Sequence, residues 1–262
     1  KPSNSDLMPI FAQLYFTWNP ISMNPNSAPS FMHYNQRFRN IDEIKNILSK
    51  IKVPIKEIMF VEHHLAHAAT AYYLSPWNLD EEILVFTADA AGDGLSSTVS
   101  VADKGQINRI KNSESTYYNS LGYSFYGEIT NYLGMKEGDH EYKVMGLAPY
   151  GKSEYCYDKI KQIIDIDESN PLKFKNKMDT FKPLFQVKLH NLLAGQRFDN
   201  IAAATQEWFE NLVTRWIKNA IKQTGIHKIA CSGGSFLNVK ANQKILSLPE
   251  VDDTFFCPAA GD

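Results

Sequence analysis

Three of the chain's seven histidines lie within five positions, at His63, His64 and His67. On a helix, residues four apart share one face, so His63 and His67 would present two imidazoles one turn apart. Two imidazoles placed in this way can bind one transition-metal ion, with carboxylates from elsewhere completing the coordination. Iron, zinc and manganese all accept such ligands. The alternative interpretation is a helix surface whose histidines make ordinary polar contacts.

Two further side chains are candidates for catalysis. His64 points about a third of a turn away from its two neighbours, so it is the candidate for substrate contact or proton transfer. Lys143 adjoins the apolar run at 144–149. A charge in such surroundings is expected to find an anionic partner. We therefore take His64 and Lys143 as candidate catalytic residues.

Two glycine turns could bring a carboxylate or a phosphate to this site. Asp89 follows a predicted buried strand and precedes two glycines, which would let backbone N–H groups approach an anion. An ordinary hairpin turn has the same composition. Ser232-Gly233-Gly234 leads from a second strand into a helix predicted to begin near Ser235. Helix N-termini favour anions, which indicates nucleotide contact, whereas a tight turn would need glycine for its backbone alone.

The elements that must position these groups follow from periodicity and from turn residues. Residues 1–40 are rich in Pro, Asn and Ser and are predicted to be irregular. The predicted helices and strands are a helix at 41–52, a strand at 57–61, a helix through the histidines to 72, a hairpin at 83–102 with its turn at 89–94, helices at 121–133 and 201–223, and strands at 228–231 and 254–256. The polar stretch at 153–190 is predicted to be an insertion or small subdomain. We thus divide the chain into an irregular N-terminal segment with one helix, 1–55, and one domain, 56–262.

Composition excludes several classes of protein. Hydrophobic residues make up 44% of the 262, which is enough for a sizeable core. The net charge of −2 gives no reason to expect a nucleic-acid or membrane-surface partner. The three cysteines form no CxxC pair, so we predict neither a disulfide framework nor a zinc ribbon, and a reducing, cytoplasmic setting fits best. No apolar run approaches the length of a membrane span.

Taken together, these motifs resemble the O-carbamoyltransferase family of nodulation-factor and cephamycin biosynthesis. The matching pieces run in the family's order and are VEHHLAHAA at 61–69, TAD at 87–89, SLG at 120–122, EYKVMGLAPYG at 141–151, SGG and Asn at 232–238, and PAAGD at 258–262. The histidine run and the string at 141–151 are the most specific of them.

The resemblance implies an α/β fold, namely an actin-like ATPase (ASKHA, ribonuclease H-like) domain that is incomplete at both ends. In this family a separate domain, expected to be absent from this chain, makes carbamoyl adenylate from carbamoyl phosphate and ATP. The actin-like domain then moves the carbamoyl group to a hydroxyl of a small-molecule acceptor with the help of a bound metal, usually iron.

Carried over position by position, the resemblance implies a set of site residues. The metal ligands would be His63, His67, Asp89 and Asp262, and His64 would lie beside the reacting carbamoyl group. The adenylate would lie against Ser232, Gly233, Gly234 and Asn238.

This chain departs from the family in three ways. Ala90 and Ala91 follow Asp89 where the family usually has glycine first, which changes the turn but keeps the carboxylate. The family's opening strands have no counterpart in residues 1–40, and the sequence stops at Asp262. Two other functions stay open: a small-molecule kinase of the same fold, which would not need the paired histidines, and a noncatalytic module, which would bind neither metal nor adenylate.

Overall fold

In this computed structural model, the described residues are 45, 49, 50, 61–180 and 184–261. The irregular segment predicted at 1–40 and the strand predicted at 57–61 lie outside them, except for Val61, which is in no strand. Of the helix predicted at 41–52, only 45, 49 and 50 are described, and these are helical. The helices and strands of the described residues are α3 (His63–Tyr73), β1 (Ile83–Gly92), β2 (Leu95–Asp103), β3 (Gln106–Arg109), β4 (Ser115–Thr116), α4 (Glu128–Tyr132), α5 (Glu141–Leu147), α6 (Tyr157–Ile160), β5 (Ile164–Asp167), β6 (Asn170–Asn176), α7 (Leu184–Leu193), α8 (Phe198–Thr224), β7 (Lys228–Ser232), α9 (Val239–Leu246) and β8 (Asp253–Phe256).

A mixed sheet forms the centre of the fold, with strand order β3-β2-β1-β7-β8 and β4 paired to β2. The first three strands are antiparallel, whereas β7 runs parallel to both β1 and β8. This strand order, with helices on both faces, is that of the ribonuclease H-like domains from which actin-like ATPases are built. The predicted α/β, actin-like fold is confirmed.

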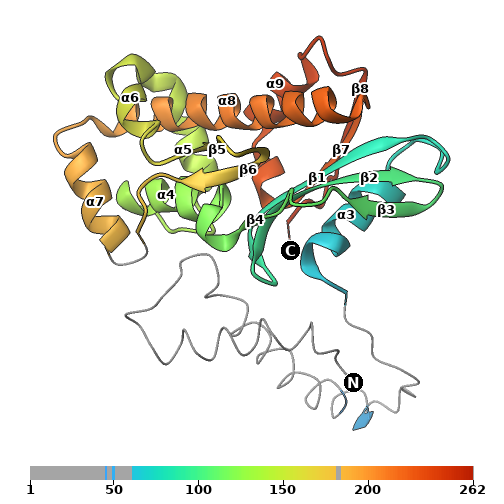
Figure 1. Ribbon diagram of the computed structural model, residues 1–262. Coiled ribbons are helices and arrows are strands. Elements are labelled where there is room, and N and C mark those ends of the chain that lie inside the picture. Colours follow the sequence, from blue (N-terminus) through green and yellow to red (C-terminus); the bar gives the residue numbers. More distant parts are fainter. Residues whose placement is uncertain (1–44, 46–48, 51–60, 181–183, 262) are drawn as a thin grey trace.

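The central strand β1 is apolar on both faces because helices cover both. On one face, Ile83 and Val85 pack against α3. On the other, the ring of Phe86 lies 4.9 Å from that of Trp216 on α8. Figure 1 shows α3 and α8 on opposite sides of the sheet. A strand that is buried on both faces typically has a continuous apolar sequence, as the first residues of β1 do.

The structure confirms the hairpin at 83–102 but corrects its turn. Strand β1 continues through Asp89 to Gly92, so the turn contains only Asp93 and Gly94, with φ of 51° and 85°. Positive φ at both central residues is typical of a type I′ turn, for which Asp-Gly is a preferred sequence. The observed turn is therefore four residues shorter than the turn predicted at 89–94, and Asp89 lies in the strand.

Two predicted helices also differ from the structure. The segment at 121–133 contains a π-helical turn, Gly122–Gly127, before α4 begins. The predicted start of the helix near Ser235 is wrong, because Gly234–Leu237 forms a single 3₁₀ turn and α9 begins at Val239. Asn238 caps α9, since its side-chain oxygen accepts from the backbone N–H of Ala241 at 3.0 Å.

The segment predicted as an insertion, where it is described, packs on α8. It contains α6, the β5–β6 hairpin and the start of α7. Trp208 and Trp216 of α8 donate their indole N–H groups to the carbonyls of Ile164 and Leu172 at 2.9 and 2.8 Å. That this segment is an insertion stays a prediction.

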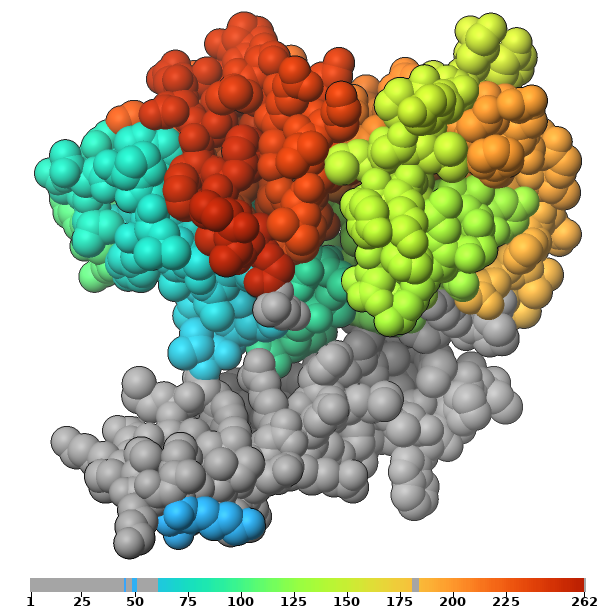
Figure 2. Space-filling view, turned by 180° about the vertical axis from the view of Figure 1, so that it is seen from behind, coloured from blue at the N-terminus to red at the C-terminus, as the bar shows by residue number. Residues whose placement is uncertain are grey.

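α8 is 27 residues long and has one buried side. Within the described part of the chain, no helix combines the length and the apolar character needed to cross a membrane. Seen from the opposite side, the segment around α5 (yellow-green) and the C-terminal segment (red) face each other across a hollow (Figure 2).

Candidate metal centre and adjoining cavity

The helix α3 brings two of the three clustered histidines to one face, as their spacing predicts. Its first residues are held by Glu62, whose carboxylate accepts from the backbone N–H groups of His64 and Leu65 at 3.0 and 2.8 Å. Arg109 of β3 donates to the same carboxylate at 2.5 Å. The start of α3, where His63 lies, is thus tied to the sheet edge as well as capped.

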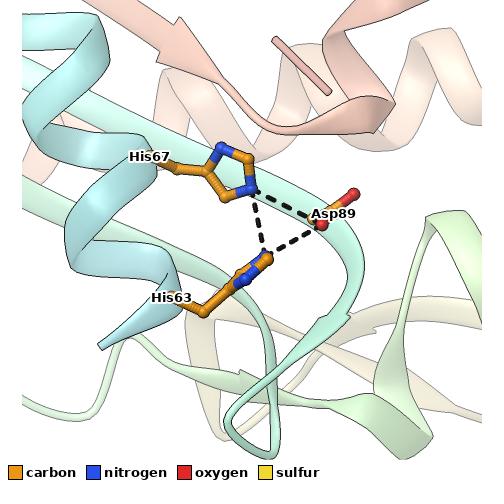
Figure 3. Close-up of side chains that lie close together, drawn as sticks. All are labelled: His63, His67 and Asp89. Atoms are coloured by element: carbon orange, nitrogen blue, oxygen red, sulfur yellow. Dashed lines mark hydrogen bonds and ion pairs between the residues drawn. The ribbon is translucent and has the colours of Figure 1, made fainter. Parts of the chain in front are cut away.

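Asp89 reaches these histidines from β1. Along this strand, alternate residues point to the same face, so Asp89 follows Ile83, Val85 and Thr87 on the side of α3. Its Oδ2 lies 3.0 Å from Nε2 of His63 and 3.5 Å from Nε2 of His67. The two Nε2 atoms are themselves 3.0 Å apart. The three side chains converge on one point, as Figure 3 shows.

This arrangement favours a negative Asp89. Burial raises the pKa of its carboxyl group, but the hydrogen bonds with His63 and His67 outweigh that effect and hold the pKa well below its usual value. Two imidazole nitrogens and one carboxylate oxygen, all within 4.8 Å of one another, form a donor set for a cation. With bonds of about 2.1 Å and angles of roughly 90–110° at an ion, ligand atoms lie about 3.0–3.4 Å apart, so the observed spacings fit iron, zinc or manganese.

The turn after β7 supports this cluster from the other side. The hydroxyl oxygen of Ser232 lies 3.4 Å from Nδ1 of His67, and Ser232 is fully buried. The backbone N–H of Gly234 donates to Oδ1 of Asp89 at 3.1 Å. A Cβ on Gly233, whose φ is 102°, would lie 2.3 Å from the carbonyl oxygen of Ala88. Glycine is therefore required there for close packing on β1.

His64 lies apart from its two neighbours, as predicted, but it points into the protein. It has no exposed surface, and its Nδ1 lies 2.8 Å from Oγ1 of Thr87. Oγ1 of Thr87 in turn lies 2.7 Å from that of Thr98. Burial lowers the pKa of His64 to about 4, so the ring is neutral at pH 7.

A cavity of about 290 Å³ adjoins the cluster at Asp89. It lies between the end of β1, the π-helical turn, α5 and the turn after β7, within the hollow visible in Figure 2. The lining includes aromatic rings and several carboxylates, among them Tyr126, Glu137, Glu141, Tyr142 and Phe209. Burial and the nearby Glu141 raise the pKa of Glu137.

A hydrogen-bonded network closes one side of this cavity. Gln206 of α8 and Asn238 exchange two amide hydrogen bonds of 2.9 Å, and the hydroxyl of Tyr126 donates to Gln206 at 2.7 Å. The sequence motifs indicated Asn238 but not Tyr126 or Gln206, nor Glu137, which also lines the cavity. A polar Gln206 among the apolar residues of an amphipathic helix is the one local signal that could have indicated the network.

The remaining predicted site residues have different outcomes. Gly234 and Asn238 line the cavity, whereas Ser232 is directed to His67. Lys143 is exposed on α5, with its ammonium 5.7 Å from the ring centre of Tyr142. Among the described residues Lys143 has no ion-pair partner, so the expected anionic contact is not found. The apolar residues next to it in sequence lie on other sides of the short helix α5, so they do not enclose its ammonium group. Asp262 lies outside the described residues.

Comparison with known proteins points to one family. Residues 30–262 match the family described as carbamoyltransferase N-terminus. The nodulation protein NolO of Bradyrhizobium diazoefficiens is 32% identical over 206 residues, covering 77% of this chain and 36% of that protein. NolNO of Sinorhizobium fredii is 30% identical over 215 residues, covering 80% and 30%. An uncharacterised protein of Methanocaldococcus jannaschii is 26% identical over 264 residues, covering 94% and 42%.

These curated relatives are longer than this chain, which covers 30–42% of their length. Among solved structures, full-length HypF in its phosphate- and nucleotide-bound form superposes with a TM-score of 0.51 at 17% identity. The superposition covers 76% of this chain and 39% of that one. Similarity at that identity shows the fold alone.

Proposed function

Because the chain belongs to the carbamoyltransferase family, we propose that it transfers a carbamoyl group from carbamoyl adenylate to a hydroxyl of a small-molecule acceptor. The observation that carries the proposal is the position of one residue, Asp89. It contributes to the His63–His67–Asp89 cluster and also lines the 290 Å³ cavity. A group held in the cavity would therefore lie next to an ion held by the cluster.

We propose that His63, His67 and Asp89 hold a divalent metal, iron first and zinc or manganese as alternatives, with Asp262 as a further ligand. The donor set and its spacings support this, as does the low pKa of Asp89. When bound, such an ion polarises a carbonyl or phosphoryl oxygen as a Lewis acid. The residues themselves keep two imidazoles and one carboxylate aimed at a common point.

We propose that the cavity holds the nucleoside part of carbamoyl adenylate. Its aromatic rings suit a flat base, and the carboxylates of Glu137 and Glu141 can accept hydrogen bonds from ribose hydroxyls. Asn238 is held by Gln206 and by its capping bond, so its amide presents a fixed polar edge to the cavity. The bound nucleotide in the HypF structure is compatible with this use of the fold.

The two candidate catalytic residues have unequal support. Lys143 is exposed and lies one position from Tyr142, which lines the cavity, so its ammonium is available to a phosphate oxygen. The complete burial of His64 gives its predicted role in proton transfer no direct support. The proposed adenylate would be made from carbamoyl phosphate and ATP by a separate domain, and the acceptor would supply the hydroxyl.

The test is metal analysis and adenylate binding of the wild-type chain beside the His63→Ala/His67→Ala double variant. We expect near-stoichiometric metal in the wild type and none in the variant, measured by elemental analysis, with carbamoyl transfer lost together with the metal. The matched control is His190→Ala/His227→Ala, which removes two exposed histidines far from the cluster in sequence.

Three results would contradict the proposal. Equal metal content in the wild type and the double variant would refute the ligand assignment. Nucleotide binding and phosphate transfer from ATP without any need for metal-binding histidines would favour a kinase of the same fold. Binding of neither metal nor nucleotide by the wild-type chain would favour a noncatalytic module.

A further inference from the structure

The imidazole of His63 lies directly against the backbone of Gly92. A Cβ added to Gly92 would be 2.0 Å from Cγ of the ring and 2.1 Å from Cδ2. Carbon atoms in contact are about 3.5–4.0 Å apart, so a side chain at position 92 and the present ring cannot coexist. Unlike Gly94, Gly92 is not among the residues with positive φ. Its backbone conformation alone therefore does not require glycine, whereas the His63 ring does.

The side chain of His63 is 19% exposed, but its ring cannot move away from Gly92 and keep its present contacts. Its Nε2 lies 3.0 Å from both Oδ2 of Asp89 and Nε2 of His67. The ring centres of His64 and His67 lie 5.2 and 4.6 Å away. The backbone N–H of His63 donates to Oδ2 of Asp93 at 2.8 Å, which fixes the start of its side chain. Rotation away from Gly92 would move Nε2 off the point that the cluster shares.

A bulge in β1 brings Gly92 to this position. Ala88 pairs with Ser97, and the next pair toward the turn is Gly92 with Leu95. Between these two pairs, β1 has three residues, 89–91, whereas β2 has only Ser96. The extra residues lie in the segment 89–91, directly after the regular part of the strand, so the irregularity displaces the backbone at Gly92, which lies against the His63 ring.

We propose that Gly92 is a positioning residue of the His63–His67–Asp89 cluster, which uses the lack of a side chain to hold the His63 imidazole in the orientation that binds metal. The inference rests on the metal centre proposed above. Residues that orient metal ligands typically alter metal affinity by about 10- to 100-fold when they are changed. We expect Gly92→Ala to weaken metal binding by that factor although it removes no ligand.

The contact itself is tested without metal, by thermal unfolding in the presence of a chelator. Gly92→Ala should lower the melting temperature by roughly 2–12 °C when His63 is present, because overpacking is destabilising. It should lower it far less in the His63→Ala chain, where the space is vacant. Equal losses in both backgrounds would overturn the proposal.

One further substitution, made both with His63 present and with His63→Ala, serves as a control for this comparison. Gly146→Ala is the matched control, since its Cβ would meet no atom within 4 Å, and it should behave alike in both backgrounds. A Gly92→Ala chain that folds only when His63 is also alanine would support the proposal in the strongest form. If Gly92→Ala and the double variant both fail to fold, the clash is not with His63 and the proposal fails.

The metal side is tested with Co²⁺ alone, titrated into the full chain and followed by its visible absorption. Gly92→Ala should show weaker binding and an altered spectrum, whereas Gly146→Ala should match the wild type. A Gly92→Ala chain with wild-type affinity and spectrum would refute the positioning role. A wild-type chain that binds no Co²⁺ would refute the proposed metal centre, whereas the unfolding comparison would still decide the Gly92–His63 contact.

Discussion

Ser232 gives the sharpest test of how this site is built, because sequence and structure assign it different partners. The Ser-Gly-Gly motif indicates contact with a nucleotide, whereas the structure places the Ser232 hydroxyl 3.4 Å from Nδ1 of His67. If Nε2 of His67 binds the metal, Nδ1 carries the proton and donates a hydrogen bond to the hydroxyl oxygen of Ser232. We predict that Ser232→Ala releases the His67 ring from this contact and weakens metal binding.

The size of the effect follows from the geometry. Ser232 is fully buried, so no water replaces the lost oxygen without rearrangement. Loss of such a supporting hydrogen bond typically costs 10- to 100-fold in metal affinity, which is about 1.4–2.7 kcal/mol. The contact is longer than the usual 2.7–3.2 Å for a hydrogen bond to oxygen. We therefore expect a loss near the lower end, about tenfold.

The assay is competition for Zn²⁺ between the chain and a chromophoric chelator, with nucleotide affinity measured on the same samples. Ser113→Ala is the control, because Ser113 is equally buried and, within the described part of the chain, its hydroxyl bonds to the backbone of Val99 and not to a side chain of the site. It should lower stability and leave Zn²⁺ affinity unchanged. Unchanged Zn²⁺ affinity in Ser232→Ala, together with weaker nucleotide binding, would refute our reasoning and restore the interpretation drawn from the motif.

Two predictions concern the framework of the site. Gly151→Ala should destabilise the fold by about 1–3 kcal/mol in calorimetry, since its Cβ would lie 1.9 Å from the carbonyl oxygen of Asp199 at the start of α8. An unchanged melting temperature would mean that α8 can shift without cost. Trp216→Phe should cost about 2–3 kcal/mol in urea unfolding, because it removes the indole donor to Leu172 and leaves a cavity in the core. A loss below about 0.5 kcal/mol would show that the Trp216 bond adds nothing.

Local patterns predicted much of the framework. The apolar runs gave the hairpin and the long helix α8, and the four-residue spacing of His63 and His67 gave their common face on α3. These features depend on residues close together in sequence, so periodicity carries them. The boundaries that failed, the turn at Asp89–Gly94 and the helix near Ser235, are those where a bulge or a 3₁₀ turn replaced the regular continuation.

The sequence by itself determined that two imidazoles would lie on one helix face and that a Ser-Gly-Gly turn would follow a strand, whereas Asp89, which was predicted to follow a strand, lies within β1. Only the tertiary structure decided how these pieces meet. The parallel pairing of β1 with β7 places Thr87 opposite Ser232, so Thr87 contacts His64 and Ser232 contacts His67. The same pairing places the backbone of Gly234 against Asp89. Strand pairing across 145 positions has no local signature, because it depends on the core that both strands share.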